Sequence, residues 1–330
     1  MIARLDLAAI DDLREALPRF THRPLPYLHH LTSTQIQAWW FDEIKRDVAD
    51  ESAIALVSID SGTIEGLVVY NDSQWDSKIL GRRIGTLKHL AAIAEETRNA
   101  DILDNLIREV IRLIADRGTE CVTSKIHPNE LSAIHTLERH DFLLMDTLLD
   151  FVVDFSRTPL DGLDRQKKIE GLSIRPAKPT DIAELVALSE KAFADYNGRY
   201  HADPKIPRDV ATKIYGEWVR SSFQGWADWI LVAEIGGEIA GYGIWKKPSQ
   251  SEMKHSLDSA HYSLAAIDPN FSDRGLYSAL AFDGMRIARD FAQRVLGPVH
   301  VSNYPVQHAL QKLGWRISGA RHSFHKWLAA

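Results

Sequence analysis

The sequence has little cysteine, no long apolar run and no excess of positive charge, and each shortage excludes a class of protein. Cys121 is the one cysteine, so no disulfide can form within the chain and a disulfide-stabilised secreted fold is excluded. A net charge of -6 argues against binding to the phosphate backbone of nucleic acid. Apolar runs such as "LLDFVVDF" are far shorter than the roughly 20 residues that span a bilayer, and acidic residues interrupt the start of the chain where a signal segment would be apolar. We therefore expect a cytoplasmic protein without nucleic-acid or membrane partners.

The sequence also contains an internal repeat. The chain of 330 residues is longer than one average domain, so two domains are the starting expectation. The stretch "IALVSIDSGTIEGLVVY" (residues 54–70) aligns with "ILVAEIGGEIAGYGIW" (residues 230–245), and both predict a hairpin whose second strand contains a glycine. A second pair follows at a similar offset, "TLERHDFLLMDT" (residues 136–147) and "ALQKLGWRISGA" (residues 309–320), each read as helix, stop and strand.

Two matches in the same order favour a duplicated α/β unit over chance similarity. Each half also has an amphipathic helix between these landmarks, beginning near Ile102 and near Gly275. Residues 156–171 are polar and lack an apolar period, which is typical of a linker. We predict a first domain at residues 1–157, a linker at 158–172 and a second domain at 173–330.

Three motifs in the second half carry a family resemblance. They are "IRPAKPTDIAEL", "IDPNFSDRGLYSAL" and "NYPVQHALQKLGW", and together with the order of predicted elements they resemble the GNAT superfamily of acyltransferases. The resemblance implies two tandem GNAT-like domains, each with a mixed, mostly antiparallel central sheet flanked by helices. It also implies an N-acyltransferase that uses acetyl-CoA or another acyl-CoA as co-substrate, acts on a small-molecule amine and needs no metal.

The resemblance further implies a coenzyme-binding turn after a strand of the second half. In the superfamily this turn reads R/Q-x-x-G-x-G/A, and here its six positions run from Ser272 to Tyr277. Backbone N–H groups and the positive end of the next helix converge at such a turn, where a pyrophosphate can bind. Arg274 is expected to supply the charge that Ser272 does not, and the ring of Tyr277 is expected to turn outward. The full set implied for the coenzyme is Ala266, Ile267, Ser272, Asp273, Arg274, Gly275, Leu276, Tyr277, Ser278 and Asn303. An ordinary strand-to-helix turn is the alternative reading.

The first half lacks this turn. Its corresponding stretch, "LKHLAAIAEETRNADIL", contains no glycine, and Glu95 and Glu96 would repel a pyrophosphate. We therefore expect the coenzyme to bind the second half only, with the first half a degenerate copy that supports the fold.

The general acid of the superfamily is missing from its usual place. The resemblance implies a tyrosine at the last position of N-x-x-A-x-x-x-Y, where this chain has Asn303 at the first position and Leu310 at the last. Tyr277 and His325 are the alternative acids, although each lone histidine is more often structural. If Leu310 faces the thioester, Leu310→Tyr is expected to keep or raise turnover, and if it lies in the core the ring will overpack it. Gly284, inside a predicted helix, is expected to tolerate a side chain.

The acceptor site is expected in the loop at residues 194–209. Tyr196, Arg199, Tyr200 and His201 suit a hydroxylated or anionic ligand, although an ordinary surface loop remains equally open. The stretch "NDSQWDSKILGRRIGTL" is similar to part of the bacterial N-acetyltransferases of TDP-linked aminosugars, of the TDP-fucosamine type, which implies a nucleotide-linked aminosugar as acceptor. The rival hypothesis is a non-catalytic coenzyme A-binding or interaction module in a biosynthetic complex. The oligomeric state stays open.

Overall fold

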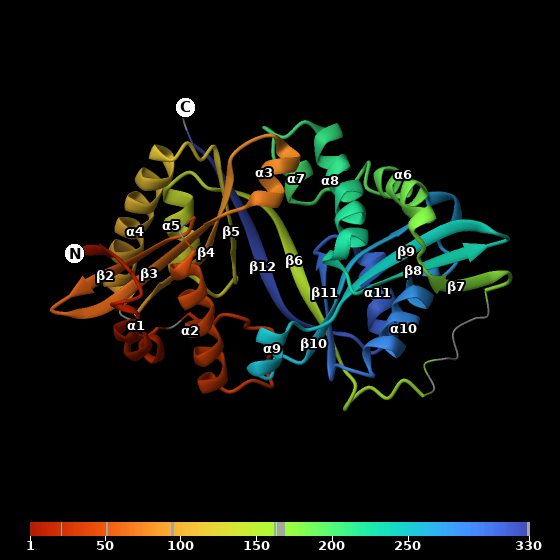
Figure 1. Ribbon diagram of the computed structural model, residues 1–330, viewed down its shortest axis with the longest axis horizontal. Helices are drawn as coiled ribbons and strands as arrows, with labels where there is room; N and C mark the ends of the chain where they lie inside the picture. Colours follow the sequence, from red (N-terminus) through yellow and green to blue (C-terminus); the bar gives the residue numbers. More distant parts are fainter. Residues whose placement is uncertain (21, 51, 94–95, 162, 164–168, 329–330) are drawn as a thin grey trace. The chain divides into compact units, whose positions relative to one another are not determined.

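The chain folds into two compact units, of which one is a continuous stretch of the sequence and the other combines two separate stretches. A computed structural model describes residues 1–20, 22–50, 52–93, 96–161, 163 and 169–328, with the side chains of residues 96 and 97 left out (Figure 1). Unit 1 comprises Met1–Thr147 and Ala320–Ala330, and unit 2 comprises Leu148–Gly319. Within the described residues, no helix has both the length and the hydrophobicity that crossing a bilayer requires.

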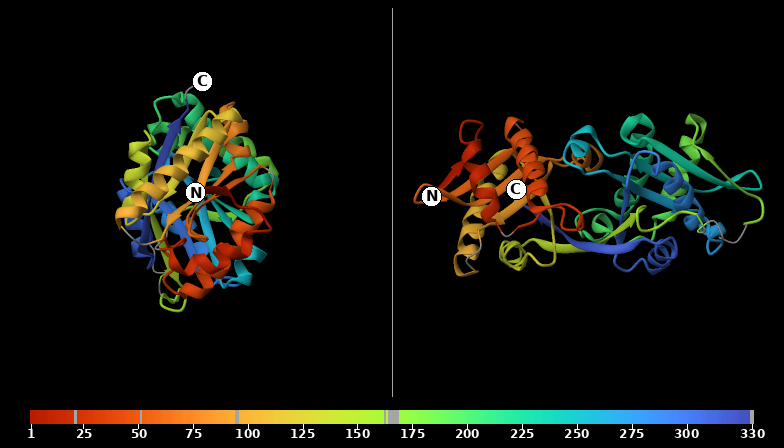
Figure 2. Two further views of the ribbon diagram at one scale, coloured as in Figure 1. Left: turned by 90° about the vertical axis from the view of Figure 1, so that its left-hand side faces the viewer. Right: turned by 90° about the horizontal axis from the view of Figure 1, so that it is seen from below.

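Unit 1 has a central sheet with helices on both faces. Its strand order is β1-β2-β3-β4-β5-β12, in which β4 and β5 are parallel and the other neighbours are antiparallel. Helices α4 and α5 pack on one face and α1 and α2 on the other, as Figures 1 and 2 show. The elements are β1 (Ile2–Arg4), α1 (Ile10–Ala16), η1 (Leu17–Arg19), α2 (Ser33–Ala49), β2 (Ile54–Asp60), β3 (Thr63–Asp72), α3 (Gln74–Leu80), β4 (Ile84–Ala92), α4 (Glu96–Asp116), β5 (Cys121–Ile126), α5 (Leu131–Arg139) and most of β12 (Arg316–Trp327).

Unit 2 repeats this architecture. Its strand order is β6-β11-β10-β9-β8-β7, with β10 and β11 parallel and the other neighbours antiparallel. Helix α10 covers one face, and α6 and α8 cover the other. The elements are most of β6 (Leu143–Asp154), then β7 (Leu172–Pro176), η3 (Pro179–Asp181), α6 (Ile182–Ala192), α7 (Arg199–Ala202), α8 (Arg208–Ser221), η4 (Ser222–Trp226), β8 (Trp229–Ile235), β9 (Glu238–Lys246), α9 (Gln250–Lys254), β10 (Ser259–Ile267), η5 (Pro269–Phe271), α10 (Leu276–Ala288), β11 (Arg294–His300) and α11 (Tyr304–Lys312).

A β-bulge at the same register position supports the duplication. In unit 1 the pairing of β3 with β4 skips Lys88, and in unit 2 the pairing of β9 with β10 skips Ser263. The hairpin glycines Gly66 and Gly241 sit at the same distance from the bulge in the two units. Because a bulge shifts which face each later side chain occupies, an identical placement in both units indicates one ancestral strand pair.

The last strand of each sequence half completes the sheet of the unit that the other half builds. Strand β6 pairs with β11 from Leu148 opposite His300 to Asp154 opposite Arg294. Strand β12 pairs with β5 from His322 opposite Ile126 to Trp327 opposite Cys121. The compact units therefore do not coincide with the predicted stretches 1–157 and 173–330, whose linker also lies partly outside the described residues. The apolar period of a segment predicts that it forms a strand, but it does not predict which strand is its partner. Strands β6 and β12 occupy equivalent places in the repeat, so their sequences do not indicate that they are exchanged between the two sheets.

Gly284 contradicts its expectation. A side chain there would place its Cβ 1.9 Å from Cζ2 of Trp245, which is fully buried on β9. The prediction that Gly284 tolerates a side chain is wrong because helix α10 approaches the sheet through this glycine. Trp245 also stacks on Tyr262 at 4.1 Å between ring centroids, so it cannot move aside without disturbing β10.

We predict that the fragments 1–157 and 173–330 will not fold when expressed separately. The first lacks β12 and the second lacks β6, so each would expose an unpaired sheet edge and aggregate. Co-expressed fragments are expected to co-purify, and a folded full-length chain cut at a protease site introduced into residues 158–172 should elute on gel filtration as one species. Two soluble, separately expressed monomers, each with its own cooperative melting transition, would contradict the exchange of strands.

Candidate active site

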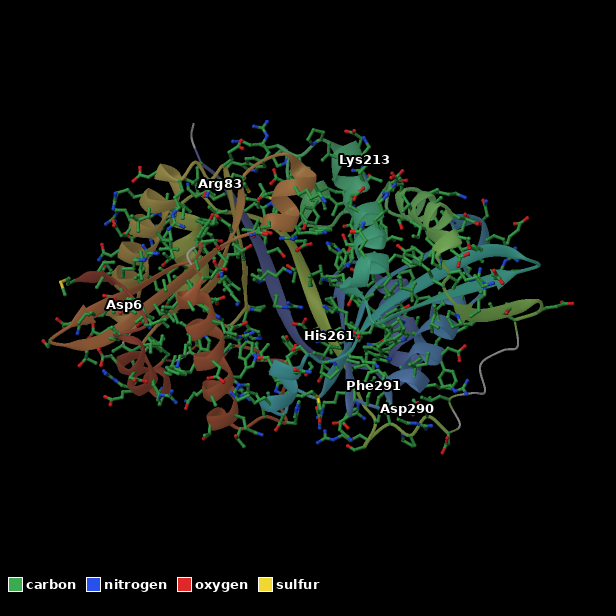
Figure 3. The ribbon with its side chains drawn as sticks, viewed as in Figure 1. Asp6, Arg83, Lys213, His261, Asp290 and Phe291 are labelled. Atoms are coloured by element: carbon green, nitrogen blue, oxygen red, sulfur yellow. The ribbon has the colours of Figure 1, made fainter. Side chains whose placement is uncertain are left out.

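The candidate site begins where β10 and β11 separate. These parallel strands pair over only three positions, the last being His261 opposite Leu296 (His261 is labelled in Figure 3). Beyond that point β10 continues along β9 to Ile267, while β11 continues along β6 to His300. Ala266 and Ile267, the predicted backbone donors, therefore lie on the separated part of β10. In an antiparallel pair, alternate N–H groups of a strand point away from the paired strand. Either the N–H of Ala266 or the N–H of Ile267 therefore points away from β9, toward the opening.

The turn after β10 leaves the start of α10 without a cap. Asp268 ends the strand, accepts a hydrogen bond from the N–H of Asn270 at 2.8 Å, and binds the ammonium of Lys191 on α6 at 2.7 Å. Asp273 and Gly275 both have a left-handed backbone, with φ of 61° and 84°. No side chain caps α10, so the N–H groups of its first turn are open to an anion.

These residues fit a coenzyme pyrophosphate. Among the described residues, a Cβ built at Gly275 would have a single heavy atom within 4 Å beyond its chain neighbours, Cδ1 of Ile169 at 3.8 Å. These residues therefore leave the approach to the backbone open. Ser272, Asp273 and Arg274 are exposed on the turn, and the guanidinium of Arg274 lies 5.2 Å from the ring centre of Phe271. Arg274 thus contributes positive charge at the turn where Ser272 contributes none.

Tyr277 does not turn outward as expected. Its ring packs on the core side of α10, 5.7 Å from the ring of Tyr262, and so leaves the turn uncovered. Burial raises the pKa of Tyr277 above its ordinary value of 10.0, so its phenol keeps its proton at neutral pH. Burial likewise raises the pKa of Tyr262, and the neighbouring Tyr277 raises it further.

The predicted acceptor loop is a cluster of aromatic rings around Tyr196. This ring makes edge contacts with Phe193, Tyr215, His201 and His300 at 5.4 to 6.2 Å between centroids. The cluster requires Gly198, because a Cβ at that residue would lie 2.4 Å from Cε1 of Tyr196. The contact with His300 places the loop beside the end of β11.

The structure brings some of the predicted residues to this opening and not others. Arg199 donates a hydrogen bond to the hydroxyl of Tyr200 and lies over its ring, and Tyr200 is buried within the loop. Asn303 caps α11 by accepting the N–H of Val306 at 3.4 Å. His325 is buried in unit 1, opposite Thr123 of β5, and so belongs to a different compact unit from the turn.

Leu310 lies in the core of unit 2. It is fully buried in the cluster that contains Trp315 and Met285. The geometry in which Leu310 faces the thioester is therefore wrong, and the alternative, in which a tyrosine at this position would overpack the core, is the one the structure favours. His308 and Tyr304, on the same helix, are exposed.

Sequence reasoning missed His300 at the end of β11. Its Nδ1 accepts the N–H of Ser302 at 3.2 Å and lies 2.8 Å from the Ser302 hydroxyl. Its place at the carboxyl end of a parallel strand, three residues before Asn303, was the available signal, because ligands bind at such strand ends in open α/β sheets.

Unit 1 shows no counterpart to the turn within its described residues. Glu95 lies outside them, and Glu96 begins α4 without a described side chain. In the first turn of α4, Arg98 makes ion pairs with Glu65 at 3.0 Å and Asp60 at 3.1 Å. The chain's own charges therefore surround the start of this helix.

Unit 1 instead has a buried polar cluster beside its bulge. Nε2 of His89 lies 2.9 Å from a carboxylate oxygen of Glu43, and Lys88 binds both Glu43 at 3.1 Å and Asp47 at 2.9 Å. Burial lowers the pKa of His89, which is 5% exposed. Burial opposes ionisation of Glu43, but its hydrogen bond with His89 and the charge of Lys88 hold its pKa below the ordinary 4.5.

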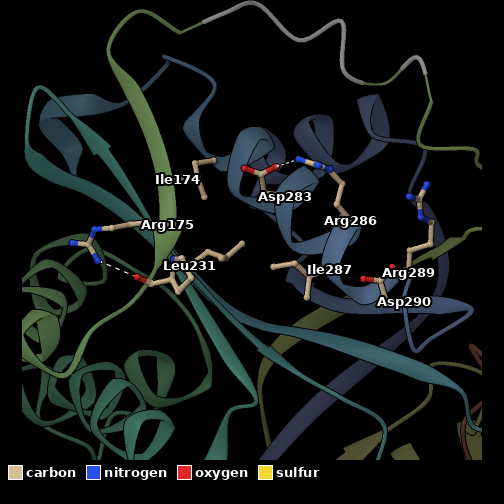
Figure 4. Close-up of a pocket in the computed structure, with 9 residues that line it drawn as sticks. Ile174, Arg175, Leu231, Asp283, Arg286, Ile287, Arg289 and Asp290 are labelled. Atoms are coloured by element: carbon tan, nitrogen blue, oxygen red, sulfur yellow. Dashed lines mark hydrogen bonds and ion pairs between the residues drawn. The ribbon is translucent and has the colours of Figure 1, made fainter.

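A separate groove of about 420 Å³ lies on unit 2 between β7, β8 and the carboxyl half of α10 (Figure 4). Its walls include Ile174, Leu231 and Ile287, and its rim is charged through Asp283 and Arg286. None of the predicted site residues lines it.

Comparison with known proteins supports the tandem arrangement. No profile of a known protein family matches the chain. A spore coat polysaccharide biosynthesis protein of Bacillus subtilis, SpsD, is 24% identical over 271 residues, which is 81% of this chain and 86% of that protein. A tandem GNAT protein from the clavulanic acid biosynthesis pathway superposes over 100% of this chain and 99% of its own, with a TM-score of 0.58 and 10% identity. A GCN5-related N-acetyltransferase from Sphaerobacter thermophilus superposes over 94% of this chain and 96% of its own, with a TM-score of 0.61 and 14% identity. The chain has the tandem GNAT fold, which confirms the predicted fold class.

We predict that His89 makes the stability of the protein depend on pH. Its folded-state pKa is below the 6.5 of the unfolded chain, so the unfolded state takes up a proton first and stability falls as the pH drops below 6.5. The free energy of unfolding falls by at most about 1.4 kcal/mol for each pH unit through this one residue. Melting temperatures at pH 7.5, 6.5 and 5.5 should fall less for His89→Gln than for the wild type, while exposed His135→Gln should follow the wild type. Equal pH dependence in all three proteins would contradict the assignment.

Proposed function

We propose that this chain is an acetyl-CoA-dependent N-acyltransferase that acts on a small-molecule amine, with its active site in unit 2. The observation that carries the proposal is the uncapped start of α10 after Gly275, beside the opening between β10 and β11. The tandem GNAT fold of the chain supports the proposal. Arg98, in the first turn of the corresponding helix α4 of unit 1, is held in ion pairs, which supports placing the coenzyme in unit 2. In this proposal unit 1 is a degenerate copy.

The backbone of the turn would hold the coenzyme. The N–H groups of Leu276, Tyr277 and Ser278 at the start of α10 would donate hydrogen bonds to the pyrophosphate, and Arg274 would add positive charge. The bound co-substrate supplies an acyl group activated as a thioester. An N–H of Ala266 or Ile267 would donate to the carbonyl oxygen as negative charge develops on it.

Tyr277 is the proposed acid for the departing sulfur. Its phenol is protonated at neutral pH and it lies on the first turn of α10, next to the coenzyme-binding backbone. His325, the other acid that the sequence suggests, lies on β12 in unit 1. A thiol with a pKa of about 8.5 leaves tolerably without help, so an acid here accelerates the reaction and is not indispensable.

The proposed acceptor is a nucleotide-linked aminosugar. The spore coat polysaccharide biosynthesis protein that the chain resembles supports a role in polysaccharide synthesis. The aromatic cluster around Tyr196 supports it as well, because such rings bind the faces and hydroxyls of sugars and bases. Arg199 would face a phosphate or carboxylate of the acceptor.

The test is acyl transfer by the full-length protein. Purified protein is incubated with acetyl-CoA and a panel of amines that includes TDP-linked aminosugars, and both free thiol and acetylated product are measured. Release of thiol in step with product from one class of amine supports the proposal. Tight binding of acetyl-CoA in calorimetry without transfer to any amine would instead support the coenzyme-binding module, which the buried Leu310 favours.

Gly275→Ala is expected to weaken acetyl-CoA binding. A methyl group at the turn obstructs the phosphate and strains a residue with φ of 84°, and losing one charged hydrogen bond costs roughly tenfold or more in Kd. Gly236→Ala is the matched control, since its φ of 60° is also left-handed but it lies in the β8–β9 hairpin. Calorimetry should show weaker binding for Gly275→Ala alone, and equal loss in both variants would indicate general destabilisation.

Tyr277→Phe is expected to lower kcat without changing the affinity for acetyl-CoA. Removal of a general acid typically costs about 10²–10⁴ in rate, and the phenyl ring keeps the packing against Tyr262. Tyr304→Phe, on an exposed tyrosine of α11, serves as the control. Unchanged turnover in Tyr277→Phe would show that sulfur leaves unaided or that another group protonates it.

A further inference from the structure

His201 has a buried ring nitrogen that nothing in the described structure satisfies. It lies on α7 inside the acceptor loop, and its Nδ1 is buried without a hydrogen-bond partner among the described residues. A buried polar atom without a partner costs about 1–3 kcal/mol, so such atoms are rare in folded proteins. The unsatisfied Nδ1 indicates that a polar group of the bound acceptor would form the missing hydrogen bond.

A chain of hydrogen bonds determines which nitrogen of His201 carries the proton. The hydroxyl of Thr212 donates to the carbonyl oxygen of Arg208 at 3.0 Å, so its oxygen is left to accept from His201. Nε2 of His201 lies 3.1 Å from that oxygen and is therefore the protonated nitrogen. Nδ1 then carries a lone pair, held in a fixed direction by α8.

The surroundings keep this lone pair available at neutral pH. Burial, and then the positive charge of Arg208, lower the pKa of His201 below 6.5. Two phenols also pack against it, those of Tyr196 and Tyr215, whose rings lie 6.2 and 5.8 Å away. Burial and the charge of Arg208 both disfavour the imidazolium before an acceptor binds.

We propose that His201 is the general base of the acyl transfer, taking a proton from the acceptor amine at Nδ1. This inference rests on the proposed function and adds a role to a residue that the sequence suggested only for binding. The acceptor enters as R–NH3⁺, gives one proton to Nδ1, and becomes R–NH2 while His201 becomes an imidazolium. The amine lone pair then forms the C–N bond as the C–S bond breaks, and the departing sulfur takes the proton of the Tyr277 phenol. The nitrogen loses its second proton, which restores the phenol, and His201 returns its own proton to solvent.

The position of His201 is consistent with this role. The ring of Tyr196 contacts both His201 and His300, and His300 ends the strand β11 that borders the opening. The proposed base therefore lies on the acceptor loop beside the opening, and the proposed acid lies on the first turn of α10, on the coenzyme side. Thr212 is a positioning residue, since it fixes the tautomer of His201 without reaching the acceptor.

The experiment compares pH profiles of kcat/KM in the full-length protein. For the wild type, kcat/KM should fall as the pH is lowered through the pKa of His201, below 6.5. His201→Gln keeps a donor for Thr212 but has no base, so kcat/KM should fall about 10²–10⁴-fold and the acid limb should disappear. Thr212→Val should lower kcat less, with the KM for acetyl-CoA unchanged. His308→Gln, exposed on α11, is the control and should match the wild type.

The outcomes separate this inference from the proposed function. A rate loss in His201→Gln with a retained acid limb would overturn the base assignment and leave His201 as a binding residue. An unchanged rate would also overturn it. So would a His201→Ala variant that keeps the wild-type melting temperature but recovers no activity when imidazole is added. A wild-type protein that binds acetyl-CoA but acylates no amine would overturn the proposed function, and the role of His201 with it.

Discussion

The separation of β10 from β11 is the constraint on which the site depends. Each strand has an antiparallel partner on its outer side, β9 for β10 and β6 for β11, so the two parallel strands can follow those partners apart after three pairs. The opening exposes backbone of β10 that a continuous sheet would satisfy. It also directs the chain after Ile267 into the turn that begins α10. The turn, Tyr277 and the aromatic loop would have no common space without that opening.

The two units show how one backbone plan can hold different chemistry. Both have the bulge, but the bulged residue is Lys88 in unit 1 and Ser263 in unit 2, and the next is His89 in one and Leu264 in the other. Unit 1 encloses paired charges at this place, which are costly to bury unless every partner is present. At the bulge of unit 2 the residues are uncharged, and the polar groups of this unit's candidate site lie around the opening between β10 and β11.

Local features of the fold were predictable from the sequence, whereas contacts between elements far apart in the sequence were not. The two hairpins and the helix after Gly275 follow from alternation, glycine turns and apolar period, and all three are present. The tight contact of Gly284 with Trp245 and the burial of Leu310 depend on how a helix packs on a sheet, which the pattern of one helix does not specify.

The site was predictable to a similar extent. Gly275 marks the turn because of its backbone freedom, and the composition of the loop suggested Tyr196 and His201. His300 and the lone pair of His201 could not be found in this way, because their roles depend on neighbours far away in the sequence or on the direction of one hydrogen bond. A residue type shows which chemistry is available, and only the surrounding atoms determine whether it is used.

The exchange of β6 and β12 also has a consequence for how the chain reaches its native state. The whole sequence of unit 2 separates β12 from the other strands of unit 1. During synthesis, one edge of β5 therefore remains unpaired until unit 2 has been synthesised. Pairings between residues so far apart in sequence close large loops and form slowly. Unit 2 is continuous in sequence and has all its strands once β11 is made, whereas the sheet of unit 1 is complete only when β12 has been synthesised. Unit 1 therefore begins first along the chain and is completed last.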